Sequence, residues 1–287
     1  MSGRFLKRKE GSIMKPTGIW TGRAAAALAA VLAGALLLGG CSRPEDIGEP
    51  DSGAQSRPAA SAVSDDGGVD MILGPVDETL EVTAEQMEAV REVVERRLEG
   101  CGIEYAAVYA DTECKQLVIH FSGDPGDAAR KAQAVDEALL CRARLAFHIG
   151  DEKEEVKDED GNPLRDESGN IIYKPAGELV VTGDEVAHAK ATMEYAPDGK
   201  ARPVVDVEFK PEGREKFAEA TKRQCEAGME PISIWLDGEM LAAPDVAAPI
   251  LDGVARISVD MDADECQRLA ALINAGALPF ALEEKTG

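Results

Sequence analysis

The sequence predicts an α+β fold of two small α+β units, which follow an N-terminal signal segment and a flexible linker. Segments of helical periodicity alternate with short segments of strand periodicity between residues 71 and 284. A polar stretch at 151–176 divides these segments into two groups. The 287 residues are 44% hydrophobic but only 4% aromatic, which is enough for two units with mainly aliphatic cores.

Residues 1–40 are typical of a secretory signal peptide. The apolar run at 24–40 follows six bases and one acid, and it is shorter than the roughly 20 residues that a membrane-spanning helix needs. Either Met1 or Met14 can be the true start, because a charged segment precedes the apolar run in both cases. The segment therefore predicts export across a membrane.

A lipid anchor and a tether are expected after the signal. The letters LGGC at 38–41 resemble a bacterial lipobox, which implies that Cys41 is lipidated and becomes the first mature residue. The alternative is an ordinary signal peptide or an uncleaved anchor in which this cysteine is incidental. Residues 41–70 are rich in Ser, Pro, Gly, Asp and Ala, which favours a disordered tether.

The first unit is expected at 71–150 and is interpreted as ferredoxin-like. Its segments suggest the order helix, strand, strand, helix, strand, with a further strand near 70–73 or 79–82 to complete the unit. Thr83 and Gln86 fit a capping box before the first helix. The five elements are expected at 79–99, 104–110, 116–121, 124–141 and 143–149.

The polar insert at 151–176 contains two similar pieces. They are the letters DEDGN at 158–162 and DESGN at 166–170, and their glycines favour turns of a hairpin. Alternating acids before a glycine raise the alternative of a calcium site. The twelve-residue loop with a terminal Glu that such a site requires is absent from the sequence, so a solvated hairpin is preferred.

The second unit is expected at 177–284. Asp237-Gly238 is a strong hairpin signal, and Asp262 with Glu265 can cap the last helix. Strands are expected at 179–182, 204–210, 232–236, 239–243 and 256–259. Helices are expected at 183–192, from Pro211 to Gly228, and at 262–275.

No residue pattern indicates catalysis, a cofactor or a metal. The sequence has no CxxC, no nucleophile motif and no phosphate-binding loop, so we expect a protein that is not an enzyme. His120 and His148 are expected in strands and His188 in a helix, all as structural residues. Five cysteines remain if the first is lipidated, and their pairing stays open: Cys101, Cys114, Cys141, Cys225 and Cys266.

The charge is strongly acidic. The formal net charge is −23, and beyond residue 40 the chain carries 25 bases against 53 acids. Such a surface repels nucleic acid and anionic lipid headgroups, and it favours basic partners. Solubility alone is the simpler explanation of this charge.

Five motifs follow one another in the second unit. Residues 234–246 contain LDG followed by AP and Val, and residues 272–279 end in AGALP. The other three lie at 181–189, 203–217 and 255–259. Their types and their order resemble the head part of the large periplasmic domain of the protein-export subunits SecD and SecDF.

The first unit resembles SecD as well, at 93–103, 119–123 and 143–147. The resemblance spans about 75–284, and it implies a SecD-head-like fold for the second unit. SecD continues into membrane helices that carry proton-coupling carboxylates, whereas this sequence stops at Gly287. The resemblance therefore implies a module without proton-driven motor activity, and the insert is interpreted as a local elaboration.

The resemblance implies an extracytoplasmic, membrane-anchored binding module that assists Sec-dependent translocation. Its expected partners are the Sec translocon or a complete SecDF, and unfolded exported polypeptides. We expect contact at an exposed sheet edge near 232–236 or at an apolar face near 240–246, although these residues can equally be core. The candidate residues are Ile232, Ile234, Leu236, Met240 and Val246. The alternative is an envelope lipoprotein with a structural or signalling role unrelated to export.

Overall fold

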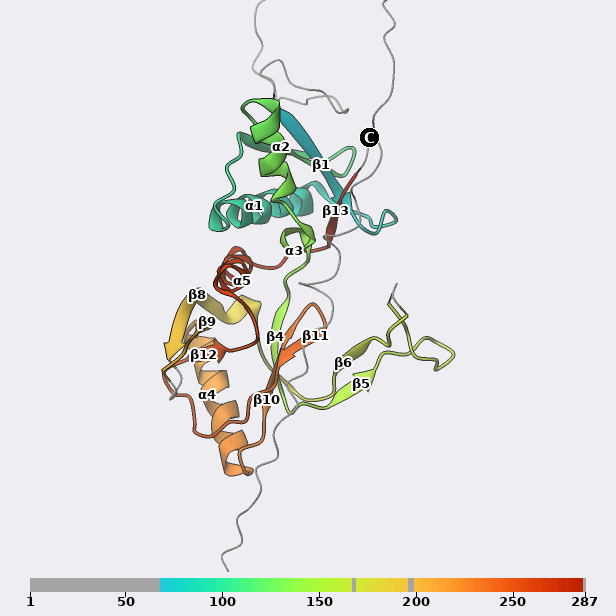
Figure 1. Cartoon of the computed structure of the whole chain (residues 1–287). Helices are drawn as coiled ribbons and strands as arrows, with labels where there is room; N and C mark the ends of the chain where they lie inside the picture. The colour runs from blue at the N-terminus through green and yellow to red at the C-terminus, as the bar shows by residue number, and fades with distance from the viewer. Residues whose placement is uncertain (1–67, 167–168, 196–198, 286–287) are drawn as a thin grey trace, which may run out of the picture. The chain divides into compact units, whose positions relative to one another are not determined.

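The computed structural model describes residues 68–166, 169–195 and 199–285 (Figure 1). These residues lie in one compact unit of the chain. The predicted signal peptide, the lipidation site Cys41 and nearly all of the tether lie outside the described residues, so these stay predictions. The boundaries assigned to the two α+β units also stay a prediction.

The first sheet has four antiparallel strands in the order β13-β1-β3-β2. Its strands are β1 Val69–Pro75, β2 Ala107–Asp111, β3 Gln116–Phe121 and β13 Leu282–Glu284. Helices α1 Ala84–Gly100 and α2 Pro125–Gln133 pack on it. The predicted capping box of α1 is confirmed, since Gln86 N donates to Thr83 Oγ1 and Thr83 N donates to Gln86 Oε1.

Two expectations for this region are wrong. Strand β4 Leu145–Ile149 was expected in the first unit, but it pairs with β7 Leu179–Thr182 and β10 Ile232–Leu236 of a different sheet. The position beside β1 is taken by β13, which is too short to show a periodicity in sequence. The helix expected at 124–141 is also two helices, α2 and α3 Glu137–Leu140, because Asp136 accepts a bond from Leu139 N and begins a new helix.

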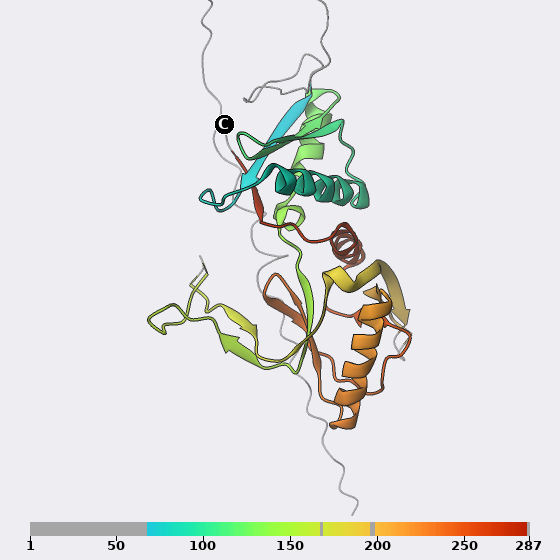
Figure 2. The same ribbon diagram turned by 180° about the vertical axis from the view of Figure 1, so that it is seen from behind.

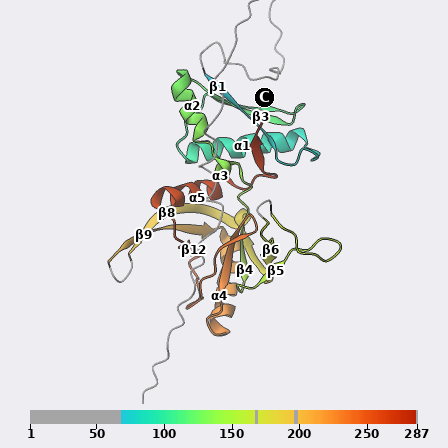
Figure 3. The ribbon, with the colours of Figure 1, turned by 45° about the vertical axis from the view of Figure 1, so that its right-hand side comes forward.

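Two further sheets follow. The second sheet has the order β11-β10-β4-β7, with β7 Leu179–Thr182, β10 Ile232–Leu236 and β11 Glu239–Ala242. The third has the order β12-β9-β8, with β8 Val186–Tyr195, β9 Ala201–Phe209 and β12 Val254–Ile257. Helix α4 Pro211–Glu226 contacts β7 and β9. Helix α5 Ala263–Ala275 lies over β8 and β9 (Figure 3).

Residues 183–192 were expected to form a helix, and this expectation is wrong. Only Gly183–Glu185 form a short 3-10 turn, and β8 begins at the next residue. The pairing of β8 with β9 shifts register between Val186 and His188. This irregularity buries Val186 and Ala189, three residues apart, which imitates helical spacing. His188 is therefore a strand residue.

The insert forms an arm that consists of β5 Lys153–Glu155, β6 Tyr173–Pro175 and the chain between them. The arm extends away from β4 and β10 in both Figure 1 and Figure 2. Gly161 and Gly169 have positive φ at the two predicted turns. Three backbone bonds close a ring at its centre: Val156 N to Ile172 O, Leu164 N to Val156 O, and Ile172 N to Leu164 O.

The β10–β11 turn is the predicted Asp237-Gly238 hairpin. Both residues have positive φ, 52° and 87°, as a two-residue hairpin loop of this sequence requires. The Asp237 carboxylate accepts bonds from Ala143 N and Arg144 N, at 2.8 Å and 2.9 Å. The turn therefore also holds the segment that enters β4.

Arg97 is a buried cation at the C-terminal end of α1, with 1% of its surface exposed. Burial lowers the pKa of its guanidinium, and the group is compensated by hydrogen bonds to backbone oxygens. The accepting carbonyls belong to Leu139, Cys141, Arg142 and Gly276. Arg97 therefore joins α1 to the end of α5 and to the chain that leads into β4.

Candidate binding pocket

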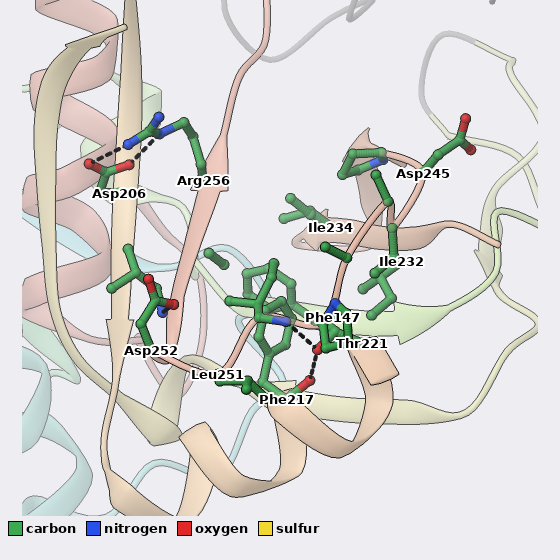
Figure 4. A pocket seen from close by; sticks show the side chains of 18 residues that line it. Phe147, Asp206, Phe217, Thr221, Ile232, Ile234, Asp245, Leu251, Asp252 and Arg256 are labelled. Atoms are coloured by element: carbon green, nitrogen blue, oxygen red, sulfur yellow. Dashed lines mark hydrogen bonds and ion pairs between the residues drawn. The ribbon is translucent and has the colours of Figure 1, made fainter. Parts of the chain in front are cut away.

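A cavity of about 680 Å³ lies between the second sheet, helix α4 and residues 244–252. We call residues 244–252 the strap, and all nine of them line the cavity. Figure 4 shows the lining side chains, which come from segments far apart in sequence. The volume lies within the range of about 300–1,000 Å³ that is usual for ligand pockets.

The pocket floor is apolar because of strand periodicity. Ile232 and Ile234 are two residues apart on β10, so their side chains lie on the same face of the sheet. Phe147 on β4 is the cross-strand partner of Ile234. These three side chains, two branched and one aromatic, together form the floor of the pocket.

Helix α4 forms the side of the pocket that faces this floor. Phe217 and Thr221 are four residues apart, which places them on one face of the helix. The Phe217 ring packs edge-on against Phe147 with centroids 5.6 Å apart, and it is tilted by 47° against Phe209 with centroids 4.9 Å apart. This aromatic cluster anchors α4 to the sheets and fixes one end of the pocket.

Several hydrogen bonds hold the strap, and three of them join it to α4 and β10. The buried Thr221 Oγ1 accepts a bond from Ile250 N at 3.0 Å. Arg214 Nε donates to Leu251 O at 2.9 Å, and Ile232 N donates to Pro244 O at 3.2 Å. These hydrogen bonds fix the position of the strap, so the pocket beneath it has a defined shape.

The pocket also has a charged rim. Arg256 donates to both carboxylate oxygens of Asp206, at 2.7 Å and 3.2 Å, and to Glu194 at 3.2 Å. The hydrogen bonds from Arg256 lower the pKa of Asp206, and partial burial works against them. Asp245 and Asp252 complete the charged lining and are exposed at the two ends of the strap.

The pocket gathers three of the five candidate residues. Ile232, Ile234 and Val246 line it, whereas Leu236 and Met240 do not. The expected exposed edge at 232–236 is wrong, because β10 lies between β11 and β4 and all of its residues are buried. A peptide strand therefore cannot add to β10. Binding at the apolar face near 240–246, the other expectation, is compatible with the geometry. The binding role of these residues stays a prediction.

Sequence reasoning missed Phe147, Phe217 and the Thr221 anchor. Phe147 and Phe217 were noted only as parts of motifs, and nothing in a single sequence indicates that they lie in contact. The run AAPDVAAPILDG at 242–253 was a possible signal, since it combines apolar residues with prolines and has no regular periodicity.

A second groove, of about 340 Å³, lies between β7 and α4. Two ion pairs occupy it, Lys216 with Glu185 at 2.6 Å and Arg223 with Glu178 at 3.3 Å. Partial burial raises the pKa of Glu185, but bonds from Lys216 and Thr182 outweigh it and lower that pKa to about 2. The charged groups of this groove therefore satisfy one another.

Other kinds of site were sought within the described residues. Five cysteines there are free thiols, and Cys266 is buried. In the same part of the chain, His, Cys, Asp and Glu side chains form no group of three that could hold a metal ion. Among the helices that the structure describes, none combines the length and apolarity that membrane crossing requires.

Comparison with known proteins relates this pocket-bearing region to protein export. Residues 154–280 match the family model of the SecDF P1 head subdomain, and they include most of the insert. SecD from Acidaminococcus fermentans is 40% identical over 107 residues, which are 37% of this chain and 24% of that protein. SecD from Sebaldella termitidis is 27% identical over 218 residues, which are 76% of this chain and 46% of that protein.

Solved structures agree. One match is the structure of "a membrane component SecDF that enhances protein export", whose sequence is 25% identical and whose TM-score is 0.56. The matched part covers 76% of this chain and 98% of that chain. SecDF in a super-membrane-facing form gives a TM-score of 0.58 at 26% identity, over 77% of this chain and 30% of that chain. The chain thus resembles SecD and SecDF, and its residues 154–280 resemble the P1 head subdomain. The predicted α+β class is confirmed.

Proposed function

We propose that this chain is a membrane-anchored extracytoplasmic module that assists Sec-dependent export by holding apolar segments of exported polypeptides. The observation that carries the proposal is the apolar pocket, whose lining residues other than Phe147 lie within the region similar to the SecDF head. The proposed partners are unfolded exported polypeptides, and the Sec translocon or a complete SecDF. The proposed role is binding, without catalysis and without proton-driven motor activity.

The pocket is suited to weak and reversible binding. Burial of one aliphatic or aromatic side chain contributes about 1.5–3 kcal/mol, and ordering an unfolded segment offsets part of it. The floor residues Ile232 and Ile234 are themselves fixed in a central strand, so the pocket needs little reorganisation. A module of this kind can hold a passing chain and then release it.

The proposed anchor is the lipidated Cys41, at the start of the tether predicted at residues 41–70, whose last two residues belong to β1. Two acyl chains give stable attachment where one gives only marginal binding. A Cys41→Ala variant is expected to lose incorporation of a radiolabelled fatty acid and to leave the membrane fraction. Unchanged retention of that variant in the membrane would show that the anchor is assigned wrongly.

The function itself can be tested by site-specific photo-crosslinking in intact cells. A photoreactive amino acid replaces Leu251, which is 64% exposed on the strap, or Tyr109, which is 45% exposed on β2 and serves as the control. Exported polypeptides or translocon subunits are expected to crosslink at position 251 and not at 109. Crosslinks only to unrelated envelope proteins would contradict the export role and favour a structural or signalling lipoprotein.

A further inference from the structure

The rim of the pocket is unbalanced in charge. Three acids and one base line the cavity: the acids are Asp206, Asp245 and Asp252, and the base is Arg256. Figure 4 shows Asp245 on the opposite side of the pocket from Asp206 and Asp252. Exposed acidic residues therefore lie at both ends of the strap.

The one base in this lining is already compensated. The Arg256 guanidinium bonds to both Asp206 oxygens and also to Glu194 on β8. These hydrogen bonds, with that of Asp206 first, raise the pKa of Arg256 and oppose the small effect of burial. An acidic ligand would have to displace two carboxylates to reach this cation, which makes Arg256 a poor anion receptor.

A further base, Arg214, contacts the strap and is not among the lining residues. Arg214 on α4 donates to Leu251 O, and its side chain packs against Gly253, where a Cβ would lie 2.6 Å from it. Arg214 therefore holds the strap in place from outside the cavity. Asp245 and Asp252 are exposed at the two ends of the strap, and the strap itself contains no base.

We infer that the pocket selects apolar segments that carry lysine or arginine next to the apolar stretch, and disfavours segments flanked by acids. This inference rests on the proposed function and names the class of polypeptide that the same pocket holds. The apolar floor provides the affinity, and the rim provides discrimination by charge. Because the rim acids are exposed, the discrimination is screened by salt beyond roughly 10 Å at 0.1 M.

The test measures peptide affinity for the full chain in detergent by fluorescence anisotropy. Three peptides share a central run of leucine and isoleucine and carry flanks of lysine, glutamine or glutamate. The lysine peptide is expected to bind about fivefold more tightly than the glutamine peptide at low salt, and the glutamate peptide more weakly than both. This difference is expected to shrink as salt is added.

Matched variants separate the rim from the general acidity of the chain. Asp245→Asn with Asp252→Asn removes two rim charges, and an amide oxygen at 252 still accepts the bond from Val254 N. Glu92→Gln with Glu113→Gln removes two exposed charges far from the pocket. Only the first pair is expected to reduce the preference for lysine flanks, by about threefold.

The outcomes distinguish the inference from the proposed function. If all three peptides bind equally at low salt, or if both variant pairs lose the preference equally, the charge selection is wrong while polypeptide binding stands. If no peptide binds, both proposals fail. Tighter binding of the glutamate peptide would reverse the inference and point to Arg256 as an anion receptor.

Discussion

The pocket and the second groove both border helix α4, but they differ in the side chains that line them. The first, beneath the strap, is lined by Phe217 and Thr221 and is mainly apolar. The second, beside β7, is lined by Lys216, Glu219 and Arg223, and its bases pair with acids of the β7 segment. One groove leaves apolar surface available, whereas the other satisfies its own charges.

The difference follows from helical geometry. Residues 217 and 221 are four apart, and residues 216, 219 and 223 are three and four apart, so each set occupies its own face of α4. A single helix therefore presents one apolar face to the core and the pocket, and one charged face to the groove beside β7. This separation predicts that substitutions of neighbouring residues on α4 have very different effects.

The largest effect is expected for Phe217→Ala. Phe217 is 3% exposed and contacts the rings of Phe147 and Phe209, so its removal leaves a cavity and lowers the free energy of unfolding by about 3–5 kcal/mol. The adjacent control Lys216→Ala loses only an exposed ion pair and is expected to cost less than about 1 kcal/mol. Urea denaturation measures both, and similar losses would contradict the division of α4 into two faces.

A smaller effect is expected for Thr221→Val. The substitution keeps the shape but removes the oxygen that accepts from Ile250 N, which leaves a partly buried donor unsatisfied. The free energy of unfolding is expected to fall by about 2 kcal/mol, and hydrogen exchange at Ile250 to accelerate. Thr221→Ser retains the hydroxyl and is the control. Unchanged exchange in the valine variant would show that this bond does not hold the strap.

In the second groove, Glu185→Gln is expected to lower stability by about 1 kcal/mol at pH 7. The carboxylate of Glu185 accepts bonds from Thr182 and Lys216, and its pKa is lowered from 4.5 to about 2. Its contribution is therefore complete above pH 4.5 and is lost as the pH falls toward 2. Thermal denaturation at several pH values should show the two proteins converging in acid, and a constant difference would contradict the assignment.

The smallest effect is expected for Arg223→Gln. Its pair with Glu178 is half exposed on both sides and spans 3.3 Å, so the free energy of unfolding is expected to change by less than about 0.5 kcal/mol. Peptide binding is expected to stay unchanged, because Arg223 lies in the second groove. A clear loss of peptide affinity in this variant would show that peptides bind at the second groove and not at the pocket.

The candidate site was predictable only in part. Ile232, Ile234 and Val246 were identified because they belong to an apolar segment with recognisable motifs, and they do line the pocket. The inclusion of Leu236 and Met240 shows the limit of that reasoning, since neither lines it. Phe147 reaches the pocket only because β4 pairs with β10, and a single sequence contains no signal for that pairing.

The sequence by itself determined the local features of this protein. The capping boxes at Thr83 and Asp262, the Asp237-Gly238 turn and the start of α4 at Pro211 depend on a few neighbouring residues, so they could be predicted. Only the tertiary structure decided which sheet takes β4, that β13 completes the first sheet, and that β8 is a strand. These choices depend on hydrogen bonds and burial between residues distant in the chain, which local patterns do not contain.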